Sequence, residues 1–267
     1  MGDLTPIVKD IYFHNRLFNA QAGNTTVDKQ RSNPFYVYGP AANMAKFPGF
    51  LGAESETTQY PSTGDFVHGH FDLNKGLDRY LHIFTRAINA GTFNYEATDV
   101  NSNWMAYSPT TIYTGDDGLI IKAVGVNHGP VPALAFRIEY DGKSIVYSGD
   151  TSSRSSKPDG TALSNGGNMV KISEGADLLI YDTAIMDDAP DIFKIPPFTD
   201  AVFKALHTTP SRIGEVAYMA GVKKLVLSHI TPVTEPNLDM VKDLIKAQGF
   251  TGKIKVAKDL KVYNLDD

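Results

Sequence analysis

The sequence contains no cysteine among its 267 residues. Disulfide bonds, a thiolate nucleophile and cysteine-ligated zinc sites are therefore excluded. Because soft thiolate ligands are missing, any transition metal that this chain binds has to be held by histidine and carboxylate side chains. The absence does not indicate a redox compartment.

Long apolar runs and clusters of basic residues are missing as well. No window approaches the roughly 18 uninterrupted apolar residues of a membrane-spanning helix, and the first residues lack the pattern of a secretory signal. We therefore expect a soluble chain without membrane partners, whose export signal, if it has one, would lie upstream of Met1. The net charge is -5 with scattered Lys and Arg, which disfavours extended nucleic-acid binding and leaves room for a small anionic substrate bound through a metal.

What the sequence does contain, from about residue 115 onward, is an alternation of short strand-like runs with helical patterns. Thr209 followed by Pro210 is a good helix start, since a capping hydroxyl precedes a proline at the first helical position. Such alternation favours an α/β layered fold. The predicted strands are 119–127, 132–140, 144–148, 177–183, 224–228, 253–257 and 260–264, and the predicted helices are 166–174, 210–221 and 236–248.

The first part of the chain is less regular. We expect helices over about 5–18 and 76–90 and a short strand at 35–38. The range 41–75 is rich in Gly, Pro, Ser and Thr and is predicted to be a long loop or a lid-like insertion.

Polar residues with ligand chemistry stand where the later strands end. His128 follows 119–127, Asp150 lies in a Ser-Gly-Asp-Thr turn after 144–148, and His229 follows 224–228. Taken singly, each histidine is compatible with an ordinary loop residue and Asp150 with a turn aspartate that caps its own loop. Together, His, Asp and His at three strand ends of one α/β segment predict a site for a divalent cation.

The same residues resemble the second half of metallo-β-lactamase-fold hydrolases, with the ribonuclease Z and arylsulfatase-like branch the closest. The resemblance covers about 115–265 and implies an α/β fold (α+β by some schemes), an αββα sandwich formed as a single domain over 1–267. It is carried, in order and spacing, by 128–139, 142–151, 175–183, 207–210 and 220–229.

By this resemblance, His128 would bind a first metal, Asp150 would bridge two metals, and His229 would bind the second. The implied cofactor is Zn²⁺, two per complete site, with Mn²⁺ or Fe as alternatives. His207 would stabilise the developing oxyanion or protonate the leaving group, with Asp182 orienting it. Ribonuclease members carry a Glu in a His-Glu-Ala-Thr run where Asp182 stands, so the carboxylate here is one methylene shorter. The alternative for His207 is a loop residue that satisfies backbone groups.

The defining His-x-His-x-Asp-His motif of the fold is missing from its place. Met1-Gly-Asp-Leu4 resembles the helix entry that follows this motif, so we expect an N-terminally truncated chain that begins just after it. His68-Gly-His70-Phe-Asp72 has similar spacing, but Leu73 occupies the last ligand position and no apolar strand precedes it. A solvated insertion loop is therefore favoured there over a metal site.

These features leave three functions open. About 22 residues separate His128 from Asp150, which leaves no space for the long tRNA-gripping arm of ribonuclease Z members, so we favour hydrolysis of a small-molecule ester, a phosphodiester or sulfate ester. A ribonuclease Z-like RNA endonuclease is one alternative. The other is a noncatalytic remnant with a binding role, because each metal would retain only Asp150 and one histidine. An open sheet edge would favour a homo-oligomer.

Overall fold

The computed structural model describes residues 6–7, 34–47, 56–72, 75–76, 79, 95–105, 108–152, 167–187 and 197–265. The chain divides into two compact units, one of Met1–Gly39 with Pro61–Asp99 and one of Pro40–Tyr60 with Val100–Asp267. The single domain over 1–267 stays a prediction, and each unit is described by itself. No helix in the described part of the chain has the length and apolar character needed to cross a membrane.

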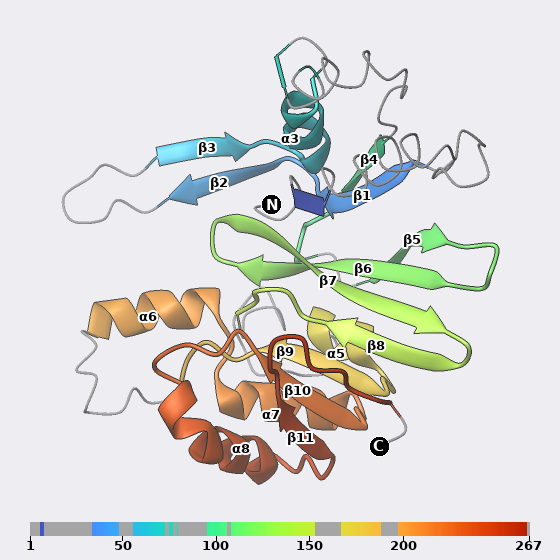
Figure 1. Ribbon diagram of the computed structural model, residues 1–267. Coiled ribbons are helices and arrows are strands. Elements are labelled where there is room, and N and C mark those ends of the chain that lie inside the picture. Colours follow the sequence, from blue (N-terminus) through green and yellow to red (C-terminus); the bar gives the residue numbers. More distant parts are fainter. Residues whose placement is uncertain are drawn as a thin grey trace. The chain divides into compact units, whose positions relative to one another are not determined.

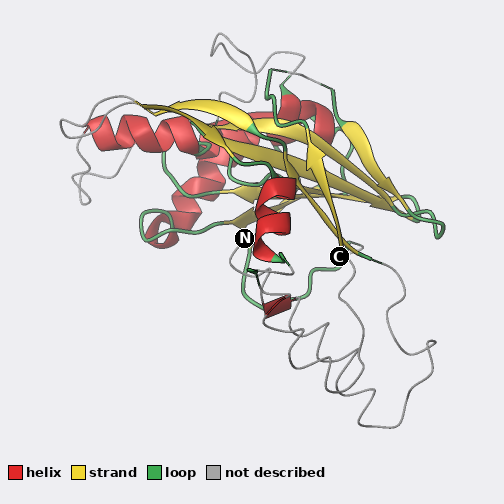
Figure 2. Cartoon of the chain, turned by 90° about the horizontal axis from the view of Figure 1, so that it is seen from above, coloured by secondary structure: helices red, strands yellow, loops and turns green. Residues whose placement is uncertain are grey.

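The second unit is built on one seven-stranded sheet (Figure 1). The first three strand pairs, from β5 to β8, are antiparallel, and the pairs from β8 to β11 are parallel. Its strands form one twisted layer (Figure 2). In spatial order they are β11 (Lys253–Val256), β10 (Lys224–Ser228), β9 (Leu178–Asp182), β8 (Lys143–Tyr147), β7 (Val131–Tyr140), β6 (Ile120–His128) and β5 (Thr110–Thr114).

Helices lie on one face of this sheet and close the core (Figure 1). Val146, Leu179 and Leu225 point from three strands toward Ile213 and Ile245 of the helices, and all five are fully buried. Burial of each such side chain contributes about 1.5–3 kcal/mol to the free energy of unfolding. The helical elements of this unit are α5 (Asn168–Ser173), α6 (Pro197–Leu206), α7 (Pro210–Met219), η5 (Glu235–Asn237) and α8 (Leu238–Ala247).

The strand register brings several strand ends to the same edge of the sheet. The ends of β9 and β10 are level because Ser228 pairs with Asp182 in a parallel ladder. β8 is parallel to β9, so the turn that follows β8 leaves at this edge too. The chain between β6 and that turn is a simple hairpin, since β7 and β8 are joined by Asp141 and Gly142, both with positive φ (47° and 70°).

The first unit has a small core of its own. Strand β1 (Phe35–Pro40) pairs with β4 (Tyr95–Val100), and helix α3 (Thr63–His70) begins with a reciprocal capping box between Ser62 and Asp65. Val67 and Phe71 are buried against the side chains of these strands.

Within the described residues, the α/β prediction is confirmed and most element bounds agree. The strands predicted from 119 to 257 match β6 to β11 within one residue, and the three later helices match α5, α7 and α8 within two. For 41–75 the loop alternative is wrong, because this range holds the antiparallel pair β2 (Asn43–Phe47) and β3 (Glu56–Tyr60) as well as α3, and the lid-like insertion stays a prediction. The predicted strand 260–264 is wrong too, since Leu260 has a φ of 59° in a turn. The predicted helices 5–18 and 76–90 lie almost wholly outside the described residues.

Candidate functional site

Five side chains gather where strands of the second unit end. His128 is the last residue of β6, Asp150 lies in the turn after β8, and Asp182 is the last residue of β9. His207 follows α6, and His229 follows β10. The structure therefore brings together all five residues that the sequence singled out, and their roles as ligands or catalytic groups stay predictions.

Asp150 stands between two histidines. Its Oδ2 lies 3.9 Å from His128 Nε2 and its Oδ1 lies 3.3 Å from His229 Nδ1, so each carboxylate oxygen faces a different ring. Gly149 makes this placement possible: its φ is 60°, and an added Cβ would lie 2.6 Å from the carbonyl oxygen of Leu134. The sharp bend expected in the Ser-Gly-Asp-Thr turn is thus present.

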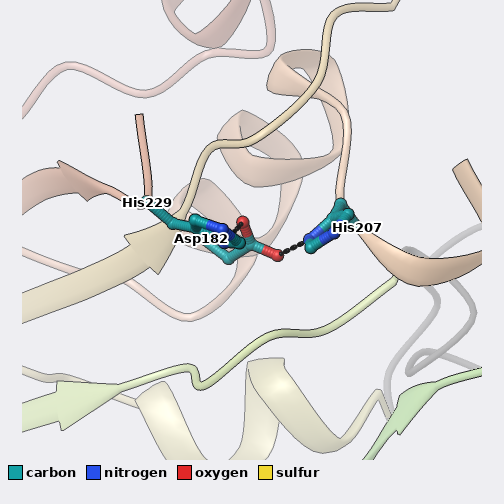
Figure 3. Close-up of side chains that lie close together, drawn as sticks. All are labelled: Asp182, His207 and His229. Carbon is teal, nitrogen blue, oxygen red and sulfur yellow. Dashed lines mark hydrogen bonds and ion pairs between the residues drawn. The ribbon is translucent and has the colours of Figure 1, made fainter. Parts of the chain in front are cut away.

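Asp182 joins His207 to His229. His207 Nδ1 lies 2.6 Å from Asp182 Oδ2, and His229 Nδ1 lies 3.1 Å from Asp182 Oδ1 (Figure 3). Only 1% of the Asp182 side chain is exposed, and it also accepts hydrogen bonds from the backbone N–H groups of Thr151 and Ala184. The shorter carboxylate therefore does reach His207.

The surroundings of His207 favour its protonated form. Burial of the imidazole works against protonation, but the hydrogen bond to Asp182 and the negative charges of Asp182 and Asp150 outweigh it, so the pKa of His207 is raised above its usual value. A histidine with a raised pKa that lies beside a reaction centre is suited to donate a proton.

His128 is oriented by a backbone carbonyl. Its Nδ1 donates a hydrogen bond to the carbonyl oxygen of Leu206 at 2.7 Å, which leaves Nε2 as the nitrogen that faces Asp150. A histidine ligand is commonly oriented by such a bond from its other ring nitrogen. No sequence pattern points to Leu206, because its contribution is a main-chain atom that the fold brings near His128.

Two further contacts hold the loops of the site. The backbone N–H of Ser152 donates to the carbonyl oxygen of Asn127 at 2.6 Å, which ties the Asp150 turn to the end of β6. The helix start at α7 differs from expectation, since the Thr209 side chain makes no capping bond. Asp187 replaces it by accepting hydrogen bonds from the backbone N–H and the hydroxyl of Ser211.

His229 has a strained backbone. Its φ is 55°, in the left-handed region that non-glycine residues rarely adopt. Such strain costs about 1–3 kcal/mol and persists where the surrounding structure imposes it, as at functional sites. The conformation holds the His229 ring against Asp150 and Asp182.

The donor set fits a divalent cation. Two atoms bound to one tetrahedral zinc ion lie about 3.3 Å apart, close to the separations of His229 Nδ1 from Asp150 Oδ1, 3.3 Å, and from Asp182 Oδ1, 3.1 Å. Among the described residues, Asp182, His207 and His229 form a group whose ligand atoms all lie within 4.8 Å of one another. Asp182 thus has the geometry of a possible ligand, a role that the sequence had not suggested.

His68 and His70 are not among the five side chains of this site. Both lie on α3 in the first unit, so the solvated loop expected there is wrong. His68 Nδ1 lies 3.3 Å from the Tyr95 hydroxyl, and the His70 ring stacks on Phe66. In the described part of the chain these histidines form no group of metal ligands.

Similar sequences carry the name ribonuclease Z. The ribonuclease Z of Mycobacterium tuberculosis (strain ATCC 25618 / H37Rv) is 31% identical over 145 residues, which cover 54% of this chain and 48% of that protein. The ribonuclease Z of Pseudomonas putida (strain KT2440) is 27% identical over 164 residues, covering 54% of this chain and 46% of that protein. The chain thus spans about half the length of these curated relatives.

Solved structures and a family model were matched as well. The metallo-beta-lactamase fold protein YhfI from Bacillus subtilis is 22% identical with a TM-score of 0.46, covering 71% of this chain and 63% of its own. Human tRNase Z, short form, is 16% identical with a TM-score of 0.46, and the match covers 88% of this chain and 69% of that protein. The model of the beta-lactamase superfamily domain matches residues 64–230, more than half of the chain. The chain therefore belongs to the beta-lactamase superfamily and is similar, over about half of its length, to ribonuclease Z.

Proposed function

We propose that this chain supplies one half of a two-metal site for the hydrolysis of a small-molecule ester, a phosphodiester or a sulfate ester. The observation that carries the proposal is the placement of Asp150, whose two oxygens face His128 and His229 separately. A carboxylate whose two oxygens face two different histidines has the arrangement of a bridging ligand.

Each residue would have a separate role in this site. His128 and Asp150 would hold one cation, and Asp150 and His229 the second. The chemistry that such cations supply when bound is Lewis acidity, which lowers the pKa of water at the site. His207, which binds Asp182 through Nδ1, keeps Nε2 available to give a proton to the leaving group. Asp182 fixes the tautomer and orientation of that ring.

The preference for a small substrate rests on the hairpin between His128 and Asp150. The span consists of β7, a two-residue turn and β8, without an inserted arm. The net charge of -5 agrees, because a protein that grips a long polyanion needs concentrated positive charge. The names of the relatives favour RNA endonuclease activity as the second candidate.

Hydrolysis of bis-p-nitrophenyl phosphate and p-nitrophenyl sulfate, with Zn²⁺ or Mn²⁺ added, tests the proposal, and a precursor tRNA substrate tests the second candidate. We expect ester hydrolysis that a chelator abolishes and that Asp150→Asn lowers by about 10²-fold or more. The matched control is Asp239→Asn, whose side chain is 97% exposed on α8. Equal rates for Asp150→Asn and the control would refute the role of Asp150.

The noncatalytic remnant makes different predictions. An intact site should bind about two zinc-type ions per chain after dialysis, and less than about a tenth of that would count against the proposed metal chemistry. The genomic sequence upstream of Met1 provides an independent check. An in-frame apolar strand followed by His-x-His-x-Asp-His there would supply the missing ligands, and its absence would favour the remnant.

A further inference from the structure

Thr208 lies in the short segment between α6 and α7, directly after His207. It is fully buried, and its Oγ1 donates a hydrogen bond to the carbonyl oxygen of Thr151 at 2.5 Å. Thr151 is the residue after Asp150. The hydroxyl therefore connects the loop of His207 to the turn of Asp150, although 57 positions separate Thr208 from Thr151.

The Thr208 side chain has a second neighbour. The buried side chain of Tyr181 makes a hydrogen bond with the Thr208 side chain. A threonine hydroxyl has one proton to donate and lone pairs to accept with. The donation to Thr151, with Tyr181 beside it, holds the Thr208 hydroxyl in place.

These contacts close a ring around the proton donor of the site. His207 binds Asp182 Oδ2, which accepts the N–H of Thr151 at 3.3 Å. The carbonyl of Thr151 accepts from Thr208, and Thr208 is bonded covalently to His207. Because every link of the ring is hydrogen-bonded or covalent, His207 cannot shift relative to the Asp150 turn without breaking a link.

We propose that Thr208 is a positioning residue, whose buried hydroxyl sets the place of His207 relative to Asp150. This inference rests on the proposed function for its catalytic consequence and on the hydrogen-bonded ring for its structural one. Thr208 acts through its neighbours, so its removal should lower the rate of the chemical step and leave substrate binding nearly unchanged.

The test compares Thr208→Val, which keeps the shape and removes the hydroxyl, with Thr208→Ser, which keeps the hydroxyl. A misplacement of about 1 Å can cost about 10²-fold in rate, so we expect Thr208→Val to lower kcat by about that factor, with KM changed less than about twofold. Thr208→Ser should restore most of kcat. The matched control is Thr234→Val, another fully buried threonine, whose hydroxyl bonds Thr231 within its own turn.

Amide hydrogen exchange of Thr151 gives a readout that needs no activity. In Thr208→Val this N–H should exchange about tenfold faster, since its loop opens more easily, while it stays unchanged in Thr208→Ser and Thr234→Val. If the unaltered chain hydrolyses no ester but the exchange changes as expected, the proposed function fails and the positioning role stands. Unchanged exchange and unchanged kcat in Thr208→Val would overturn the positioning role and leave the proposed function intact.

Discussion

Replacing Asp182 by Asn removes one negative charge from the centre of the site and little else. The side chain is 1% exposed and accepts from His207 at 2.6 Å and His229 at 3.1 Å. Asn keeps the volume and one acceptor oxygen, but its amide N–H₂ group would face one of the two rings. That ring then has to present an unprotonated nitrogen, which reverses its tautomer.

The magnitude follows from the bond that is lost. A hydrogen bond to a charged group contributes about 1.5–3 kcal/mol, and the 2.6 Å bond to His207 is the shorter of the two. We therefore expect Asp182→Asn to lower the free energy of unfolding by about 2 kcal/mol in acid. We also expect a loss of about 10²- to 10⁴-fold in kcat, because the proton donor is misoriented.

The loss of stability should depend on pH in a defined direction. The pKa of His207 is raised in the folded protein, with burial opposing and Asp182 favouring protonation. A raised pKa contributes stability that is fully present below the unfolded value, about 6.5, and that disappears as pH rises through the folded value. The difference between the unaltered chain and Asp182→Asn should therefore be larger at low pH than at high pH.

Urea unfolding followed by circular dichroism, at about pH 5.5 and about pH 9 and with a chelator present, measures this difference. Asp239→Asn serves as the exposed control and should show no such dependence. If Asp182→Asn destabilises the protein equally at both pH values, the charge interaction between Asp182 and His207 does not contribute as described.

Three other variants probe the scaffold. The pKa of Asp177 is lowered, first by its hydrogen bond to Lys223. Asp177→Ala should therefore lower the free energy of unfolding by about 1–3 kcal/mol at pH 7. This loss should become smaller as pH falls through the lowered pKa. Gly149→Ala should lose both stability and activity, whereas Gly142→Ala should keep activity, since an added Cβ meets backbone in the first case and open space in the second; equal activity in both would refute this steric argument. His229→Gly should be more stable in urea than His229→Ala by about 1 kcal/mol, because alanine is strained at positive φ; the reverse order would contradict the strained backbone.

The later strands could be predicted because their local pattern and their environment agree. β6, β9 and β10 are largely buried segments, and a polar group at the end of such a segment lies at the edge of the sheet. Strand β5 and helix α6 escaped prediction. β5, Thr110–Thr114, contains no buried residue in its pattern, so the apolar run that marks a core strand is missing. Strands β2 and β3 and helix α3 were not predicted either, because the range 41–75 is rich in residues that favour turns.

The sequence by itself determined the α/β alternation of the second half and the residues with ligand and acid chemistry, because these depend on residue type and on distances along the chain. Only the tertiary structure decided how those residues meet. The reach of Asp182 to His207 and His229, the positive φ of His229 and the buried bond from Thr208 to Thr151 join segments distant in the chain or depend on packing around them. A hydrogen bond is set by ångström separations between atoms, and those separations exist only once the sheet register and the helix packing have formed.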